Sequence, residues 1–199
     1  MSVDAKIVKE LRDKTGAGMM DCKSALSESG GDMEKAIDFL RTKGLAAAKK
    51  KAGRATNEGL VFSYIHPGGK VGVLVEISCE TDFVARTDEF QKFCKDVAMH
   101  VAAASPLALN VEDLDPAIVD REREIAKQQA IESGKPENIA EKIVEGRVGK
   151  FYKEVCLLEQ AYVKDPNMTV KDLLDSTIGS LGENMGIRRF VRFQLGEEL

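Results

Sequence analysis

The sequence has few aromatic residues and no long apolar run. Its 199 residues include no tryptophan and only three tyrosines, so few rings are present on which the bases of a single-stranded nucleic acid could stack. No apolar segment approaches the ~20 residues that a membrane-spanning helix needs. The N-terminal segment MSVDAKIVKELRDK mixes charged with apolar residues and lacks the apolar stretch of a signal peptide. The sequence therefore predicts a cytoplasmic protein that makes no membrane contact.

Motifs that bind metals or nucleotides are also missing. The four cysteines form no CxxC pair, and with only two histidines they do not predict a zinc site, so we expect reduced thiols. Gly68-Gly69-Lys70 is not a phosphate-binding loop, because it lacks the earlier glycine and the following Ser or Thr. We therefore expect no metal site and no cofactor in this chain.

The balance of charge argues against a nucleic-acid-binding protein. The chain has 33 acidic and 29 basic residues, for a formal net charge of −4, whereas nucleic-acid-binding proteins usually carry a basic excess. Residues 41–54 differ, because they contain six basic residues and no acidic one. This segment predicts a basic helical linker whose side chains face solvent, and the other interpretation is an RNA contact. An RNA-binding or ribosome-associated helical protein is therefore the alternative function.

Residues 1–53 predict a small domain of three short helices with the basic linker at its end. Apolar residues recur at helical spacing in three groups, which glycine-containing segments separate. Asp32 is placed to cap the third helix, and Gly44 is expected to end it. The apolar positions are Val3, Ile7 and Leu11, then Met19, Cys22 and Leu26, then Met33, Ala36, Ile37 and Leu40.

Residues 54–199 predict a second domain, of the α+β class. From residue 58 the apolar residues alternate with period two, and a turn at residues 66–69 joins two expected strands into a hairpin. Residues 187–195 alternate again, and this late strand most economically joins the hairpin in a three-stranded antiparallel sheet. Helices would pack on the sheet, including one that Thr169 and Asp172 cap as a capping box.

Residues 116–158 predict a helical hairpin within this domain, with a break between its arms at residues 133–136. On the second arm, apolar residues step 4-3-4-3, as in the seam of a coiled coil. This seam would pack either on the other arm of its own hairpin or on a second copy of the chain, which makes a homodimer one expectation. The seam residues are Val144, Val148, Phe151, Val155 and Leu158.

Two apolar residues fit the expected interior poorly. Met20 falls off the helical face that Met19 and Cys22 share, so it either packs on the linker or offers an adaptable binding surface. Phe83 would share the core face of Phe90 if one continuous helix followed Thr81, and periodicity favours this interpretation. If the segment is instead a separate helical turn, Phe83 projects from it with the carboxylate of Asp82 alongside.

Cys79 raises a third functional hypothesis, a hydrolase with a cysteine nucleophile. Such an enzyme needs a nearby base, and His66 could lie across the hairpin. Because Cys79 ends an otherwise apolar strand, a buried structural cysteine is the favoured interpretation. His100 is interpreted in the same way, as a polar residue that is satisfied at the edge of the core.

Three segments resemble a known family, in that family's order. The similarity is to bacterial translation elongation factor Ts, and it extends along the whole chain. Longer members of the family carry two sheet-and-helix core units, and this chain would carry one. The three segments are LRDKTGAGMMDCK from Leu11, ETDFVA from Glu80 and ENMGIRRF from Glu183.

The resemblance implies a guanine nucleotide exchange factor for the GTPase elongation factor Tu, in its GDP-bound and nucleotide-free forms, and not an enzyme with catalytic residues of its own. The N-terminal helices would form a UBA-like module, which would dock on the G domain through Leu11, Met19 and Met20. Ile187 would add a contact from the end of the sheet. A further segment would dislodge magnesium from the partner's nucleotide site, and it would consist of Thr81, Asp82, Phe83 and Val84.

Overall fold

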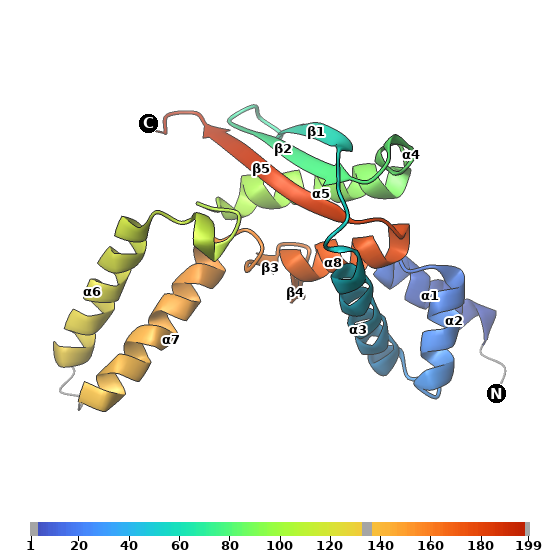
Figure 1. The fold of residues 1–199 in the computed structure, drawn as a ribbon, viewed down its shortest axis with the longest axis horizontal. Helices are drawn as coiled ribbons and strands as arrows, with labels where there is room; N and C mark the ends of the chain where they lie inside the picture. Colours follow the sequence, from blue (N-terminus) through green and yellow to red (C-terminus); the bar gives the residue numbers. More distant parts are fainter. Residues whose placement is uncertain (1–3, 133–136, 198–199) are drawn as a thin grey trace.

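The computed structural model describes residues 4–132 and 137–197, and these form an α+β fold, as the sequence predicts (Figure 1). The chain begins with three helices and then forms a β hairpin, to which a final strand returns after a helical hairpin. Val3 and the predicted break at residues 133–136 lie outside the described residues.

The three N-terminal helices are those that the sequence predicts. The side chains of Asp4 and Asp32 cap the first and third by accepting hydrogen bonds from main-chain N–H groups. Gly16 ends the first helix with φ 69°, a left-handed conformation that glycine adopts without strain. The helices are α1 (Ala5–Thr15), α2 (Met19–Glu28) and α3 (Met33–Lys51), and their shared core contains Val8, Leu11, Cys22, Ala25, Leu26 and Ala36.

The third helix does not end at Gly44, as the sequence predicted, but continues to Lys51. Gly44 is buried where α3 crosses α8 (Val170–Leu181), and a methyl group at Gly44 would lie 3.4 Å from the carbonyl oxygen of Asp175. A methyl group at Gly179 of α8 would lie 3.2 Å from the Cα of Gly44. Gly44 therefore permits a close helix crossing, and residues 41–51 of the basic segment belong to a helix packed on the second half of the chain.

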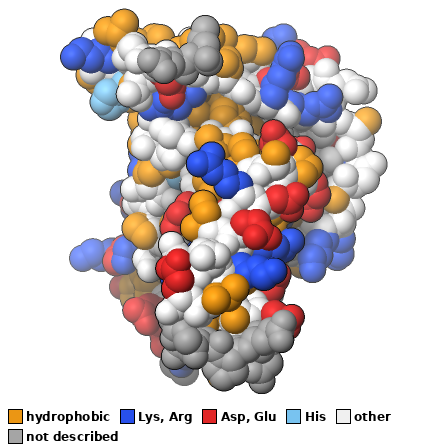
Figure 2. All heavy atoms as spheres, turned by 90° about the vertical axis from the view of Figure 1, so that its left-hand side faces the viewer, with side chains coloured by type: hydrophobic (Ala, Val, Ile, Leu, Met, Phe, Trp, Pro, Cys, Tyr) orange, Lys and Arg blue, Asp and Glu red, His pale blue; other side chains and the backbone are white. Residues whose placement is uncertain are grey.

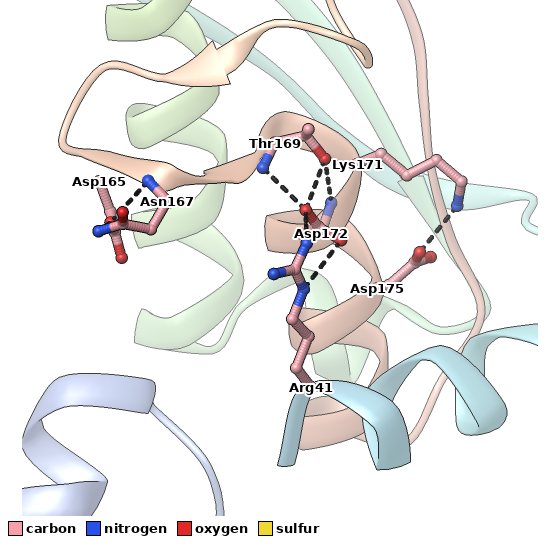
Figure 3. A network of polar contacts seen from close by, with 7 residues as sticks. All are labelled: Arg41, Asp165, Asn167, Thr169, Lys171, Asp172 and Asp175. Atoms are coloured by element: carbon pink, nitrogen blue, oxygen red, sulfur yellow. Dashed lines mark hydrogen bonds and ion pairs between the residues drawn. The ribbon is translucent and has the colours of Figure 1, made fainter. Parts of the chain in front are cut away.

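An ion pair joins the same two helices at the start of α8 (Figure 3). Arg41 donates hydrogen bonds to both carboxylate oxygens of Asp172, at 2.6 and 3.3 Å. Asp172 also accepts hydrogen bonds from the N–H and the hydroxyl of Thr169, which confirms the predicted capping box. Burial alone would raise the pKa of Asp172, but the hydrogen bonds from Thr169 and the charge of Arg41 together lower it. One carboxylate thus caps α8 and binds α3.

The sheet consists of three antiparallel strands in the order β1-β2-β5, which confirms the predicted hairpin and late strand. Helix α5 lies against one face of the sheet (Figure 1), and this face, α5 and α8 together form the main core. The other face is open to solvent in the part of the chain that the structure describes. These elements are β1 (Glu58–Ile65), β2 (Val71–Cys79), α5 (Asp88–Ala104) and β5 (Met185–Gln194).

A bulge in β5 changes which side chains face the core. Ile187 pairs with Ile77, whereas the next pair joins Arg189 to Glu76, so Arg188 is an extra residue. Because one residue is added, the alternation of side chains reverses at this point. Ile187 is buried on the inner face, and Val191 lies on the outer, exposed face.

The predicted helical hairpin is present, and the apolar seam of its second arm packs against the first arm. Val144 and Val148 are buried against Ala126 on the other arm. The second arm ends at Val155, so the predicted seam position Leu158 lies beyond the helix. The arms are α6 (Pro116–Glu132) and α7 (Glu137–Val155).

A short β hairpin, which the sequence did not predict, follows α7. His100 of α5 holds the segment around it: its Nε2 donates to Gln160 Oε1 at 2.8 Å, and its Nδ1 accepts from the N–H of Val163 at 3.3 Å. Burial lowers the pKa of His100, and the interpretation of a satisfied core residue is confirmed. The remaining elements are α4 (Asp82–Ala85), the 3-10 turn Val111–Asp113, β3 (Ala161–Tyr162) and β4 (Asp165–Thr169).

The close crossing of α3 and α8 predicts opposite outcomes for one substitution at two helical glycines. Gly44→Leu should lower the free energy of unfolding by about 1–3 kcal/mol, because the added side chain overpacks the crossing. Gly146→Leu on α7 has no atom within 4 Å of the new Cβ and should stabilise slightly, because leucine is the better helix former. Thermal melting followed by circular dichroism compares the two, and equal melting temperatures would contradict the role assigned to Gly44.

Candidate functional site

The single turn α4 separates β2 from α5, and two threonines define its limits. The hydroxyl oxygen of Thr81 accepts from the N–H of Val84 at 3.4 Å, and that of Thr87 accepts from the N–H of Phe90 at 3.2 Å. Each threonine is an N-cap, so a helix begins twice in succession. The continuous helix that periodicity favoured is therefore wrong, and the alternative of a separate turn is confirmed.

Phe83 projects from this turn into solvent. It is 79% exposed, whereas Phe90 of the following helix is fully buried. Beside it, Asp82 forms a surface ion pair with Arg86, with 2.7 Å between carboxylate oxygen and guanidinium nitrogen. Burying a phenylalanine side chain is worth roughly 1.5–3 kcal/mol, a gain that Phe83 does not obtain within its own chain. The turn thus presents an apolar group at the surface with a carboxylate beside it.

Two carboxylates bind α4 to the loop between α8 and β5. Glu183 accepts two hydrogen bonds from Thr81, from the main-chain N–H at 3.0 Å and from the hydroxyl at 2.7 Å. In the opposite direction, Glu80 accepts from the N–H of Asn184 at 2.6 Å. This N–H, together with the nearby guanidinium of Arg54, holds the pKa of Glu80 below its usual value. Residues 80–81 and 183–184 therefore hold each other in place through hydrogen bonds in both directions.

A second exposed apolar group lies in the first turn of α2, where Met20 is 74% and Met19 is 45% exposed. The loop before these methionines is tied to the end of α8, because the Ser180 hydroxyl donates to the Gly16 carbonyl at 3.1 Å. Figure 1 shows α1, α2 and α4 at the same end of the molecule. The structure therefore brings the two exposed apolar groups to one end of the fold.

The other predicted site residues are less exposed than Phe83. Thr81, Asp82 and Val84 are half-buried around it. Leu11 is fully buried among the N-terminal helices, and Ile187 is buried where it pairs with Ile77 in the sheet. Leu11 and Ile187 thus expose almost no surface of their own.

Glu80 and Glu183 were not assigned a role from the sequence. The available signal was their position, because each begins a segment that carries the family resemblance. Glu183 binds Thr81 and Glu80 binds Asn184, and in each case the two residues are about a hundred positions apart. Local sequence patterns do not report such contacts.

No catalytic pair forms at Cys79. The thiol is buried and donates to the Thr81 carbonyl at 3.1 Å, and burial raises its pKa. Cys79 pairs with Glu58 at the start of β1, whereas His66 follows the other end of that strand and contacts Tyr64. A structural cysteine, the favoured interpretation, is confirmed.

Among residues 4–132 and 137–197, no three His, Cys, Asp or Glu side chains are grouped so that they could hold a metal ion. Within the same ranges, no helix combines the length and the apolar character that crossing a membrane requires.

Comparisons with known proteins agree along the chain. The model of the family described as Elongation factor TS matches residues 45–197. Elongation factor Ts of Geotalea daltonii is 64% identical over 199 residues, which are 100% of this chain and 92% of the relative. Elongation factor Ts of a Thermoanaerobacter species is 64% identical over 195 residues, covering 98% and 96%. Elongation factor Ts of Nitratidesulfovibrio vulgaris is 63% identical over 198 residues, covering 100% and 99%.

The exposure of Phe83 predicts that truncating it hardly affects folding. Phe83→Ala should change the free energy of unfolding by less than about 0.5 kcal/mol, as is usual for surface substitutions. Phe90→Ala, the matched control on the next helix, should cost roughly 3–5 kcal/mol because it leaves a cavity in the core. Urea unfolding of both variants measures the difference, and a large loss of stability in Phe83→Ala would show that Phe83 is a core residue.

Proposed function

Because the chain belongs to the elongation factor Ts family, as its three signature segments predicted, we propose that it is a guanine nucleotide exchange factor for elongation factor Tu. It acts in the cytoplasm and promotes GDP release without catalytic residues of its own. The observation that carries the proposal is Phe83, an aromatic side chain held in solvent on a capped turn beside a carboxylate.

Phe83 and Asp82 act at the nucleotide site of the partner. They enter beside the magnesium ion and the phosphate-binding loop, and they displace the groups that hold the ion. An exchange factor must bind the nucleotide-free partner more tightly than the loaded one, and this coupling is reciprocal. Weakening GDP binding ~1,000-fold takes about 4 kcal/mol. Burial of Phe83 against the nucleotide-free partner alone supplies roughly 1.5–3 kcal/mol of it.

The N-terminal helices supply the affinity. Met19 and Met20 form the docking surface on the G domain, and the flexible thioether side chain of methionine suits such a surface. Leu11 and Ile187 contribute from inside the fold, since Leu11 packs α1 on α2 and Ile187 holds the end of β5 in the core.

An RNA-binding role has less support. Four of the six basic residues in 41–54 already contact groups of this chain. The contacts are Arg41 with Asp172, Lys43 with Asp21, Lys51 with the Ile178 carbonyl and Arg54 with Glu80.

We further propose that the predicted homodimer forms through the open face of the sheet. The α7 seam that suggested a dimer is occupied by its own hairpin, whereas the sheet exposes apolar side chains on all three strands. Figure 2 shows hydrophobic side chains along the upper edge of the molecule, where the sheet lies. Pairing two such faces would remove the apolar surface from water. The residues are Val61, Ile65, Leu74, Val191 and Phe193.

The exchange function predicts that substoichiometric amounts of the protein accelerate release of a fluorescent GDP analogue from purified elongation factor Tu. Phe83→Ala should lower the maximal release rate about 30-fold, which corresponds to the ~2 kcal/mol of an interface hot spot. Met20→Ser should instead raise the concentration that gives half-maximal release. Leu107→Ala, an exposed apolar truncation away from both groups, is the control and should change neither quantity.

Removing magnesium distinguishes displacement of the ion by Phe83 from an effect of Phe83 on the phosphate-binding loop. EDTA removes the ion and speeds spontaneous GDP release, so the difference in release rate between wild type and Phe83→Ala should shrink. An unchanged difference would reject magnesium displacement as the main effect of Phe83. Unchanged GDP release with the wild-type protein would reject the exchange function itself.

The dimer proposal predicts twice the chain mass of 21.8 kDa by light scattering. Leu74→Asp should return the mass to that of one chain, because it places an unpaired charge in the interface. Ile131→Asp on α6 changes an exposed side chain elsewhere and should leave the dimer intact. A wild-type mass of one chain at micromolar concentration would contradict the proposal.

A further inference from the structure

A helix of four residues does not hold itself together. Forming the first helical turn fixes several residues for a single hydrogen bond, so an isolated turn such as α4 is unstable without outside contacts. The direction in which Phe83 points therefore depends on the groups that bind the ends of the turn. At the start of the turn, Thr81 makes these contacts through its hydroxyl and its N–H.

The hydroxyl of Thr81 has one proton and must both donate and accept. The hydroxyl donates a hydrogen bond to Glu183 Oε1 at 2.7 Å, which leaves a lone pair of the hydroxyl oxygen free to accept from the N–H of Val84 at 3.4 Å. The other carboxylate oxygen of Glu183 accepts from the N–H of Thr81 at 3.0 Å. Both donors of the capping residue are thus bound by one carboxylate, and hydrogen bonds to a charged acceptor are the stronger kind.

The carboxylate is itself held in place. Its neighbour Asn184 donates its N–H to Glu80 and its side-chain amide to the Arg54 carbonyl, at 2.6 and 2.7 Å. Cys79, at the end of β2, donates its thiol to the Thr81 carbonyl at 3.1 Å. Thr81 is therefore fixed through its N–H, its hydroxyl and its carbonyl.

From this arrangement, and resting on the exchange function proposed above, we propose that Glu183 is a positioning residue for Phe83. It does not touch the partner's nucleotide; it orients the Thr81 hydroxyl so that the hydroxyl caps α4 and points Phe83 outward. This assigns a role to the third signature segment, because the two hydrogen bonds from Thr81 to Glu183 form a brace for the second segment.

The test combines Glu183→Gln with Phe83→Ala. A glutamine amide accepts through one atom only, so one of the two Thr81 donors loses its partner. Glu183→Gln alone should lower the maximal rate of GDP release about tenfold, with less than a twofold change in the half-saturating concentration. In the Phe83→Ala background it should have no further effect, because the side chain that it positions is gone. Equal slowing in both backgrounds would overturn the proposal.

Control variants separate the brace from general effects. Thr81→Ser keeps the hydroxyl and should release GDP faster than Thr81→Val, which removes the hydroxyl and should resemble Glu183→Gln. Glu145→Gln removes a carboxylate paired with Arg123 on the helical hairpin and should leave the rate unchanged. A Thr81→Ser variant as slow as Thr81→Val would overturn the assignment to the hydroxyl.

Amide hydrogen exchange tests the brace on the free chain, without the partner. In Glu183→Gln, the amides of Thr81 and Val84 should exchange at least tenfold faster, while those of α5 stay protected. Unchanged exchange at both amides overturns the brace even if the protein releases GDP. If the wild-type protein does not release GDP, the proposed exchange function fails, and amide exchange still decides separately whether Glu183 holds the turn.

Discussion

Contact between the main chains of α3 and α8 is the constraint on which the arrangement of the fold depends. At Gly44 and Gly179 no side chain separates the two helices, so they meet at a distance that a single methyl group would disturb. Arg41 adds a bidentate ion pair at one end of the crossing. Close-packed contacts of this kind deform little, so the N-terminal helices keep a defined position relative to the sheet.

Helix α8 connects the two exposed apolar groups through its C-terminal end. Near its C-terminus, Ser180 holds the loop before α2, and directly after the helix Glu183 holds the start of α4. Under the proposed function, docking at Met20 positions Phe83 because this relation is fixed. In the proposed exchange reaction, the free energy of docking offsets the cost of disturbing the nucleotide site.

The turn that carries Phe83 departs from the local rules that the rest of the chain follows. A large aromatic side chain lies in water, and a four-residue helix stands where a longer one was favoured. The chain compensates nearby, with two threonine caps and two carboxylates that accept main-chain N–H groups. Departures of this kind concentrate at functional sites, where contacts to a partner replace contacts within the fold.

Local patterns were enough to predict the three N-terminal helices, the β hairpin, the late strand, the helical hairpin and the cap at Thr169, because each of these elements depends on residues a few positions apart. The pairing of the late strand with the hairpin followed instead from the most economical topology. The local patterns gave the wrong prediction at Gly44, whose neighbours belong to α8. They were also wrong at Phe83, because the apolar spacing fits one helix but Thr87 begins a second one. The family resemblance named the segments of the proposed site but not how they meet. Only the tertiary structure decided that Glu183 holds Thr81, because that hydrogen bond joins residues 102 positions apart, and periodicity reports only the face on which a residue lies, not its distant partner.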